Sequence, residues 1–183
     1  MKKPNESIIC AGFGGQGIMV LGRVLANAGM KKGYNVTWMP SYGAEVRGGT
    51  AHSMVKMSDK RIASPLVPAP DTAFIMSGPS LDKFEKKIKK GGMMILNTSM
   101  VKRKVRRKDL DVTKAPLTGE AIKLGNVKVA NMIAIGIYVA KKKIFDRDLL
   151  FKVIEKMAMG HEELILINIK ALEKGIEIAS NLA

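Results

Sequence analysis

Short apolar runs alternate along this chain with stretches whose apolar residues recur every three to four positions. Ser7–Ala11 is a nearly continuous apolar run of strand length. Gly17–Lys32 follows it with the helical period, and Leu21 and Leu25 lie on its apolar face. Thr50–Met57 alternates in steps of two instead, which is the period of a half-exposed strand. The chain therefore mixes strands with amphipathic helices.

The same pattern predicts the remaining elements. We expect strands over Ser7–Ala11, Asn35–Met39, Thr50–Met57, Thr72–Met76, Met93–Asn97 and Val127–Ala130. We expect helices over Gly17–Lys32, Ser80–Lys90, Glu120–Leu124, Asn131–Lys142, Asp146–Met157 (capped by Asp146) and His161–Ser180. Strands that alternate with helices favour an open, Rossmann-like α/β fold with a mostly parallel sheet, helices on both faces and a helical C-terminal third. We expect one domain over residues 1–183.

The charge is strongly positive: 31 basic and 16 acidic residues give a net charge of +15. The segment Lys83–Lys108 contributes +10 of this charge, since its eleven Lys and Arg residues are opposed only by Glu85. Such a segment either attracts an acidic partner, a phosphorylated ligand or nucleic acid, or it is simply a solvated surface. Phe84 is its only aromatic residue, so bases have little to stack on, and nucleic acid is the disfavoured alternative.

Composition also limits the chemistry. Cys10 is the only cysteine, so no internal disulfide and no iron–sulfur ligand set is expected. We expect Cys10 in the core, His52 in a structural role and His161 at the surface, and we predict no catalytic residue and no metal ligand. The N-terminus lacks the apolar stretch of a signal peptide, and Met132–Ala140 is shorter than the roughly 20 residues that span a membrane. We therefore expect a cytoplasmic protein without membrane contact.

The candidate chemistry begins with a glycine turn. Gly12, Gly14 and Gly17 have the spacing G-x-G-x-x-G between the first strand and the first helix, where backbone N–H groups can face an anion. The alternative is a purely structural turn. A dinucleotide site would need an acidic residue at the end of the second strand, and residues 37–41 contain none, so NAD binding and a free NAD(P)-dependent dehydrogenase are disfavoured. Gln16 could bond a ligand or an opposing loop.

A second glycine-rich loop spans Ser41–Thr50. It carries Arg47, whose planar fork suits a carboxylate or phosphate, although an internal ion pair with Glu45 is the alternative. We expect both loops to leave the carboxyl ends of neighbouring strands and to form one cleft there. The predicted binding residues are Gly12, Gly14, Gly15, Gln16, Gly17, Ser41, Tyr42, Arg47, Gly48 and Gly49.

Four segments together carry a family resemblance over nearly the whole chain. These are Gly12-Phe-Gly-Gly-Gln-Gly17, Tyr42-Gly-Ala-Glu-Val-Arg-Gly-Gly49, Ser64-Pro65 and Pro79-Ser-Leu-Asp-Lys-Phe84. In this order and spacing, they resemble the gamma subunit of 2-oxoacid:ferredoxin oxidoreductases, in particular the 2-oxoglutarate (2-oxoglutarate synthase) type. Gamma-type chains for pyruvate, branched-chain 2-oxoacids and indolepyruvate are the alternatives.

The resemblance implies a subunit of an oxidoreductase that converts a 2-oxoacid and coenzyme A to acyl-CoA and carbon dioxide, with ferredoxin as electron acceptor. It implies alpha and beta partner subunits, and a delta subunit where the complex has one. Thiamine diphosphate and iron–sulfur clusters would lie on those partners, and coenzyme A would occupy a shared site. This chain would hold no cofactor alone, would be inactive alone, and could form a homodimer when isolated.

Overall fold

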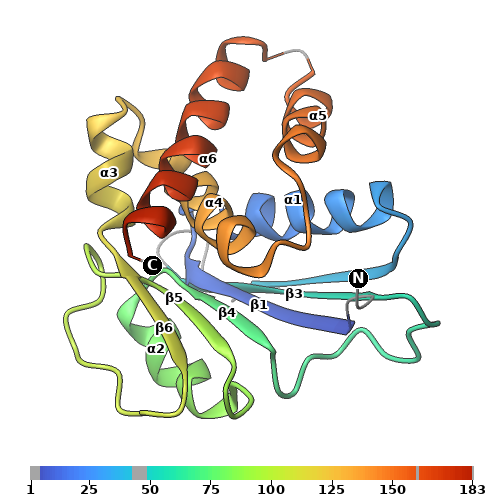
Figure 1. The fold of residues 1–183 in the computed structure, drawn as a ribbon. Helices are drawn as coiled ribbons and strands as arrows, with labels where there is room; N and C mark the ends of the chain where they lie inside the picture. Colours follow the sequence, from blue (N-terminus) through green and yellow to red (C-terminus); the bar gives the residue numbers. More distant parts are fainter. Residues whose placement is uncertain (1–4, 43–48, 160, 183) are drawn as a thin grey trace.

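The computed structural model describes residues 5–42, 49–159 and 161–182, and these residues form a sheet with helices on both faces (Figure 1). The strands are β1 (Asn5–Phe13), β2 (Asn35–Tyr42), β3 (Thr50–Ser58), β4 (Thr72–Ile75), β5 (Met93–Asn97) and β6 (Asp111–Ala115). The helices are α1 (Ile18–Lys31), α2 (Gly78–Phe84), α3 (Leu117–Lys123), α4 (Ala130–Lys142), α5 (Arg147–Met157) and α6 (Glu163–Asn181), with 3-10 turns at Glu85–Lys87 and Val127–Val129.

The sheet is mixed and mostly parallel, with the strand order β2-β3-β1-β4-β5-β6. Strands β1, β4, β5 and β6 pair in parallel, whereas β3 is antiparallel to both β1 and β2. Because β3 separates β1 from β2, these two strands are not neighbours, contrary to the expectation from the sequence. They still run in the same direction, so their carboxyl ends lie at the same edge of the sheet.

Two apolar cores lie on the two faces of the sheet. Figure 1 shows α1, α4, α5 and α6 over one face and α2 over the other. Strand β1 supplies both cores: Ile8 and Cys10 pack with α1 and α4, while Ile9 and Ala11 pack with α2. This two-sided burial explains why β1 reads as a continuous apolar run. None of the helices in the described ranges is long and apolar enough to cross a membrane.

Helix α2 is shorter than the helix expected over Ser80–Lys90. It begins at Gly78 and ends at Phe84, and Glu85–Lys87 then forms a single 3-10 turn. The backbone of Ile88 is extended, and its side chain is buried in the core beneath α2. Tertiary burial of Ile88 outweighs the weak helical preference of this short segment, so the α-helix does not continue through the lysine-rich end of the expected helix.

Two other elements differ in kind from the expectation. The strand expected over Val127–Ala130 is wrong, because Val127–Val129 is a 3-10 turn that is capped by the side chain of Asn126 and leads into α4. A short apolar run does not distinguish a strand from a buried helix end. The sequence pattern did not predict strand β6. Only Thr113 and Ala115 of its five residues are buried, so the strand carries little apolar pattern. The other elements are confirmed, with ends shifted by at most a few residues.

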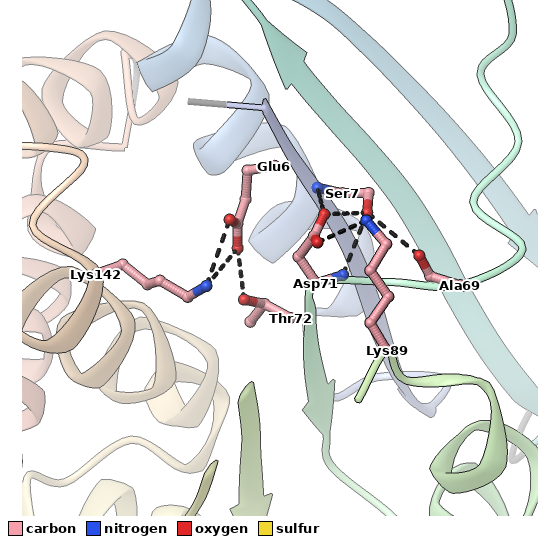
Figure 2. Close-up of polar contacts among 7 residues, drawn as sticks. All are labelled: Glu6, Ser7, Ala69, Asp71, Thr72, Lys89 and Lys142. Atoms are coloured by element: carbon pink, nitrogen blue, oxygen red, sulfur yellow. Dashed lines mark hydrogen bonds and ion pairs between the residues drawn. The ribbon is translucent and has the colours of Figure 1, made fainter. Parts of the chain in front are cut away.

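A polar network joins the amino ends of β1 and β4 (Figure 2). The Asp71 carboxylate accepts from the backbone N–H of Ser7 (2.9 Å) and from the Lys89 ammonium (2.6 Å). The Glu6 carboxylate accepts from Thr72 Oγ1 (2.5 Å) and pairs with Lys142 (3.3 Å). These contacts connect β1 and β4 at their amino ends, which is the end of the strands opposite to the glycine turn.

Candidate functional site

Gln16 locks the glycine turn between two parallel strands. Its side-chain oxygen accepts the backbone N–H of Phe13 at the end of β1 (2.7 Å), and its side-chain nitrogen donates to the carbonyl of Met76 after β4 (3.1 Å). A side chain at Gly12 would press against Gln16 and Met76, with the added Cβ 2.5 Å from Gln16 Oε1 and 2.9 Å from Met76 Cβ. The amide of Gln16 is therefore used within the protein to hold the turn.

Gly15 and Gly17 need the conformations that only glycine adopts readily. Their φ angles are +89° and +71°, and Gly17 is the N-cap residue of α1. A Cβ at Gly17 would overlap the Asn131 amide, which donates to the Gly17 carbonyl at 3.2 Å. Gly15, by contrast, has no other heavy atom within 4 Å of the position that its Cβ would take, as far as the described residues extend. The turn is thus packed at Gly17 and open at Gly15.

The two glycine-rich segments meet through their backbones. The N–H of Gly14 donates to the carbonyl of Gly49 at 3.0 Å, directly before β3 begins. Ser41 and Tyr42 end β2 opposite β3 at the same edge of the sheet. Arg47 and Gly48 lie outside the described residues, as does Glu45, and so does the side chain of Tyr42. The structure brings the described members of the two predicted loops to one edge.

A small cleft opens beside the turn at this edge, with a volume of about 200 Å³. It is lined by Gly15, Gln16, Met76, Met100, Thr118, Val127 and Ala130. These residues come from the connections after β1, β4 and β5, from α3, and from the 3-10 turn and the start of α4. Complete small-molecule sites have volumes of roughly 300–1,000 Å³. The cleft therefore suits part of a ligand or a side chain of a partner protein.

The titratable candidates lie away from this cleft. Cys10 is fully buried, as expected, and burial raises the pKa of its thiol above the ordinary range. His161 is exposed, also as expected. The His52 ring stacks at a tilt on Phe84, with 5.2 Å between the ring centroids. Among the residues that the structure describes, no group of three His, Cys, Asp or Glu side chains is placed to hold a metal ion.

The basic segment Lys83–Lys108 is partly neutralised by carboxylates. Its ion pairs join Arg103 to Asp82 and Glu85, Lys89 to Asp71, and Arg107 to Asp109. Phe84, its single aromatic residue, is only 3% exposed. It offers no face on which a base could stack, which weighs further against nucleic-acid binding.

Two polar contacts at this end of the sheet were not predicted from the sequence. Asn131 is buried at the start of α4 and bonds the glycine turn. Ser77 and Ser80, buried just after β4, hydrogen-bond each other at 2.8 Å. The signal for Asn131 was available in the sequence, because it is the one polar side chain before Tyr138 in an otherwise apolar helix. A polar residue in such a setting is generally paired.

Comparisons with known proteins cover nearly the whole chain. The sequence profile described as pyruvate ferredoxin/flavodoxin oxidoreductase matches residues 7–178. The chain is 33% identical to the 2-oxoglutarate synthase subunit KorC of Methanocaldococcus jannaschii, over 98% of this chain and 97% of that protein. It is 32% identical to the ketoisovalerate oxidoreductase subunit VorA of Methanothermobacter thermautotrophicus, over 96% of this chain but only 37% of that protein. The chain thus spans about a third of the length of this VorA relative.

Solved structures show the same fold. The gamma subunit of a keto/oxoacid ferredoxin oxidoreductase from Geobacter sulfurreducens superposes with a TM-score of 0.83 and 26% identity, over 96% of this chain and 99% of that one. The 2-oxoglutarate:ferredoxin oxidoreductase of Magnetococcus marinus superposes with a TM-score of 0.87 and 23% identity, over all of this chain and 32% of that one.

Proposed function

Since the chain belongs to the pyruvate ferredoxin/flavodoxin oxidoreductase family and is of its gamma-subunit type, we propose that it is the non-redox subunit of a 2-oxoacid:ferredoxin oxidoreductase. The complete enzyme would join a 2-oxoacid and coenzyme A to give acyl-CoA and carbon dioxide, and would pass the electrons to ferredoxin. Alpha and beta subunits, with a delta subunit in some complexes, would carry thiamine diphosphate and the iron–sulfur clusters.

The proposed substrate is 2-oxoglutarate. The relative named as a 2-oxoglutarate synthase subunit is matched over 97% of its own length, whereas the relative named for ketoisovalerate is matched over 37%. A branched-chain 2-oxoacid is the second candidate, because the relative named for ketoisovalerate has similar identity although it is much longer. Assays of the assembled complex with both 2-oxoacids distinguish the two candidates.

Within the complex, we assign the carboxyl edge of the sheet to coenzyme A or to the partner subunit that binds it. The observation that carries this assignment is the hydrogen bond between Gly14 and Gly49, which joins the two glycine-rich segments beside the open position at Gly15. The N-terminus of α1 has no acidic residue in its first turn, so its N–H groups and positive dipole end favour an anion there. Arg47 would add a cation.

A matched pair of variants tests this role in the complex co-expressed with its alpha and beta chains. Gly15 and Gly33 have nearly the same φ (+89° and +83°) and similarly open surroundings, but they lie at opposite ends of α1. We expect Gly15→Asp to raise KM for coenzyme A by about ten-fold through the added negative charge. Gly33→Asp causes the same backbone strain but places its charge at the other end of α1. KM for coenzyme A should therefore stay unchanged in this variant.

Assembly provides the second readout. If Gly15→Asp abolishes co-purification with the alpha and beta chains while Gly33→Asp does not, the edge contacts a partner subunit instead of coenzyme A. If the two variants behave alike in both assays, the glycine turn is a structural feature only. A chain that never associates with alpha and beta subunits would refute the proposed function as a whole.

A further inference from the structure

A second and larger hollow is lined by residues of β3, of the segment 64–68 and of the end of α2. It lies on the side of the sheet that α2 covers. Its volume is about 510 Å³, within the range of complete small-molecule sites. It shares no lining residue with the cleft beside the glycine turn. Two of the motif segments singled out in the sequence, Ser64-Pro65 and Pro79–Phe84, border it, although the proposed function does not use them.

The floor of this hollow is apolar. Met54, Leu66, Val67, Pro68 and Phe84 line it. Val67 and Phe84 are almost fully buried, whereas Leu66 is 55% exposed. Covering a partly exposed apolar surface of this kind with an apolar body removes it from water and lowers the free energy.

The rim of the hollow is cationic. The ammonium groups of Lys83 and Lys87 lie 5.4 and 5.5 Å from the centre of the Phe84 ring, so both charges face the same end of the hollow. Neither forms an ion pair with a carboxylate of the described residues, unlike the neighbouring Lys89 and Arg103. Burial lowers the pKa of His52, and the charges of Lys83 and Lys87 lower it further, so the neutral ring is favoured and the cationic charge of the rim comes from the lysines.

The walls of the hollow are fixed by contacts across the segment 64–68. Lys56 on β3 donates from its ammonium to the carbonyl of Ser64 (2.9 Å). The backbone N–H of Val67 points to the sulfur of Met54 at 3.3 Å. These contacts tie the segment to β3 and shape the hollow before any ligand arrives, which lowers the entropic cost of binding.

We propose that this lysine-rimmed hollow binds a small amphipathic anion, with an apolar body on the exposed part of the floor at Leu66 and Met54 and a carboxylate or phosphate between Lys83 and Lys87. An apolar floor alone does not select for charge, and two lysines alone do not retain a ligand against solvent. Together they favour a molecule that has both parts. Binding here does not depend on the function proposed above, because the hollow shares no lining residue with the cleft beside the glycine turn.

The test uses the full chain with 2-naphthoate and 2-naphthyl phosphate as probes and the uncharged 2-naphthamide for comparison. Isothermal titration calorimetry should give saturable binding of one anion per chain, with weaker binding of the amide. The two anions show whether a carboxylate or a phosphate head is preferred. The chain has two histidines, so the ring-proton signals in NMR report the location: those of His52 should shift on binding, and those of His161 should not.

The matched variants alter two exposed lysines each. Lys83→Gln with Lys87→Gln should weaken binding of the preferred anion by about ten-fold and leave the amide unaffected. Lys86→Gln with Lys90→Gln removes the same charge from the same segment but outside the hollow, and should change affinity less than two-fold. Equal losses in both double variants, an unmoved His52 signal, or no saturable binding of either anion at millimolar concentration would each overturn the inference.

Discussion

At the residue scale, two neighbouring carboxylates have opposite pKa shifts. Burial raises the pKa of Asp71, but hydrogen bonds from Lys89 and Ser7 outweigh it, so the pKa lies below the ordinary value. Burial also raises the pKa of Glu6, and there the contacts with Thr72 and Lys142 do not compensate, so the pKa lies above the ordinary value. One carboxylate therefore stabilises the fold as an anion, whereas the other costs stability when it ionises.

These shifts predict opposite pH dependences. A carboxylate with a lowered pKa in the folded state stabilises the fold above its unfolded pKa, and this stability is lost as pH falls through the folded pKa. Asp71→Asn should therefore reduce the loss of stability on acidification, and it should lower the free energy of unfolding at pH 7 by about 2 kcal/mol. For Glu6, whose folded pKa is raised, stability is lost as pH rises from the unfolded to the folded value. Glu6→Gln should remove that loss. Urea unfolding from pH 3 to 8, followed by circular dichroism, measures both.

Lys174 supplies a control for this experiment, since its ion pair with Glu177 lies on the exposed surface of α6. Lys174→Gln should change the pH profile little, because exposed ion pairs contribute little free energy. If the Glu6 and Asp71 variants moved the profile in the same direction, the contacts described for these carboxylates would not dominate their titration.

At the element scale, α4 and α6 touch through their backbones. A Cβ on Gly136 would overlap the Leu172 carbonyl oxygen, and a Cβ on Gly175 would overlap that of Ile133. The two glycines face each other at the crossing, with 2.9 Å between the position for the Gly136 Cβ and the Gly175 Cα. Two glycines thereby allow the long C-terminal helix to lie closely against α4 (Figure 1).

We therefore expect Gly136→Ala to lower the free energy of unfolding by about 3 kcal/mol, because backbone atoms cannot move aside as a flexible side chain can. Gly119→Ala in α3 is the matched helical glycine, and its added Cβ would meet its nearest atom at an ordinary 3.5 Å. It should raise the free energy by about 0.5–1 kcal/mol through helix propensity. Urea denaturation measures both, and a harmless Gly136→Ala would contradict the close crossing.

At the scale of the whole molecule, two cores share the strands of one sheet. Leu25 is buried in the core under α1 and α4, and Leu81 is buried in the core under α2. Because β1 contributes side chains to both, the loss of one core exposes the back of the strands that carry the other. We expect the chain to unfold as one cooperative unit.

Leu25→Ala and Leu81→Ala test this coupling. Each should lower the free energy of unfolding by about 3 kcal/mol and shift the urea midpoint without changing the slope of the transition. Fluorescence of the single Trp38, which packs against the first core, and far-ultraviolet circular dichroism should report the same midpoint in both variants. Separate midpoints in Leu81→Ala would mean that the two faces unfold independently.

The apolar pattern predicted most of the secondary structure, and its failures share a cause. The end of α2 and the turn at Val127–Val129 are set by what their side chains pack against, which a local period does not contain. Strand β6 lies at an edge of the sheet, so it has little apolar pattern to detect. The order of the strands was equally hidden, because β3 inserts between β1 and β2 only in three dimensions.

The sequence by itself determined the α/β class, the glycine turn between β1 and α1, and the family, because these depend on local period and on the order of motifs along the chain. Tertiary structure alone decided that Gly14 bonds Gly49 and that Gln16 is occupied within the turn. It also decided that Lys83 and Lys87 gather over an apolar hollow. The contacts of Gly14 with Gly49 and of Gln16 with Met76, like the lining of the hollow, join residues that are distant in sequence, and only the packed sheet brings them together.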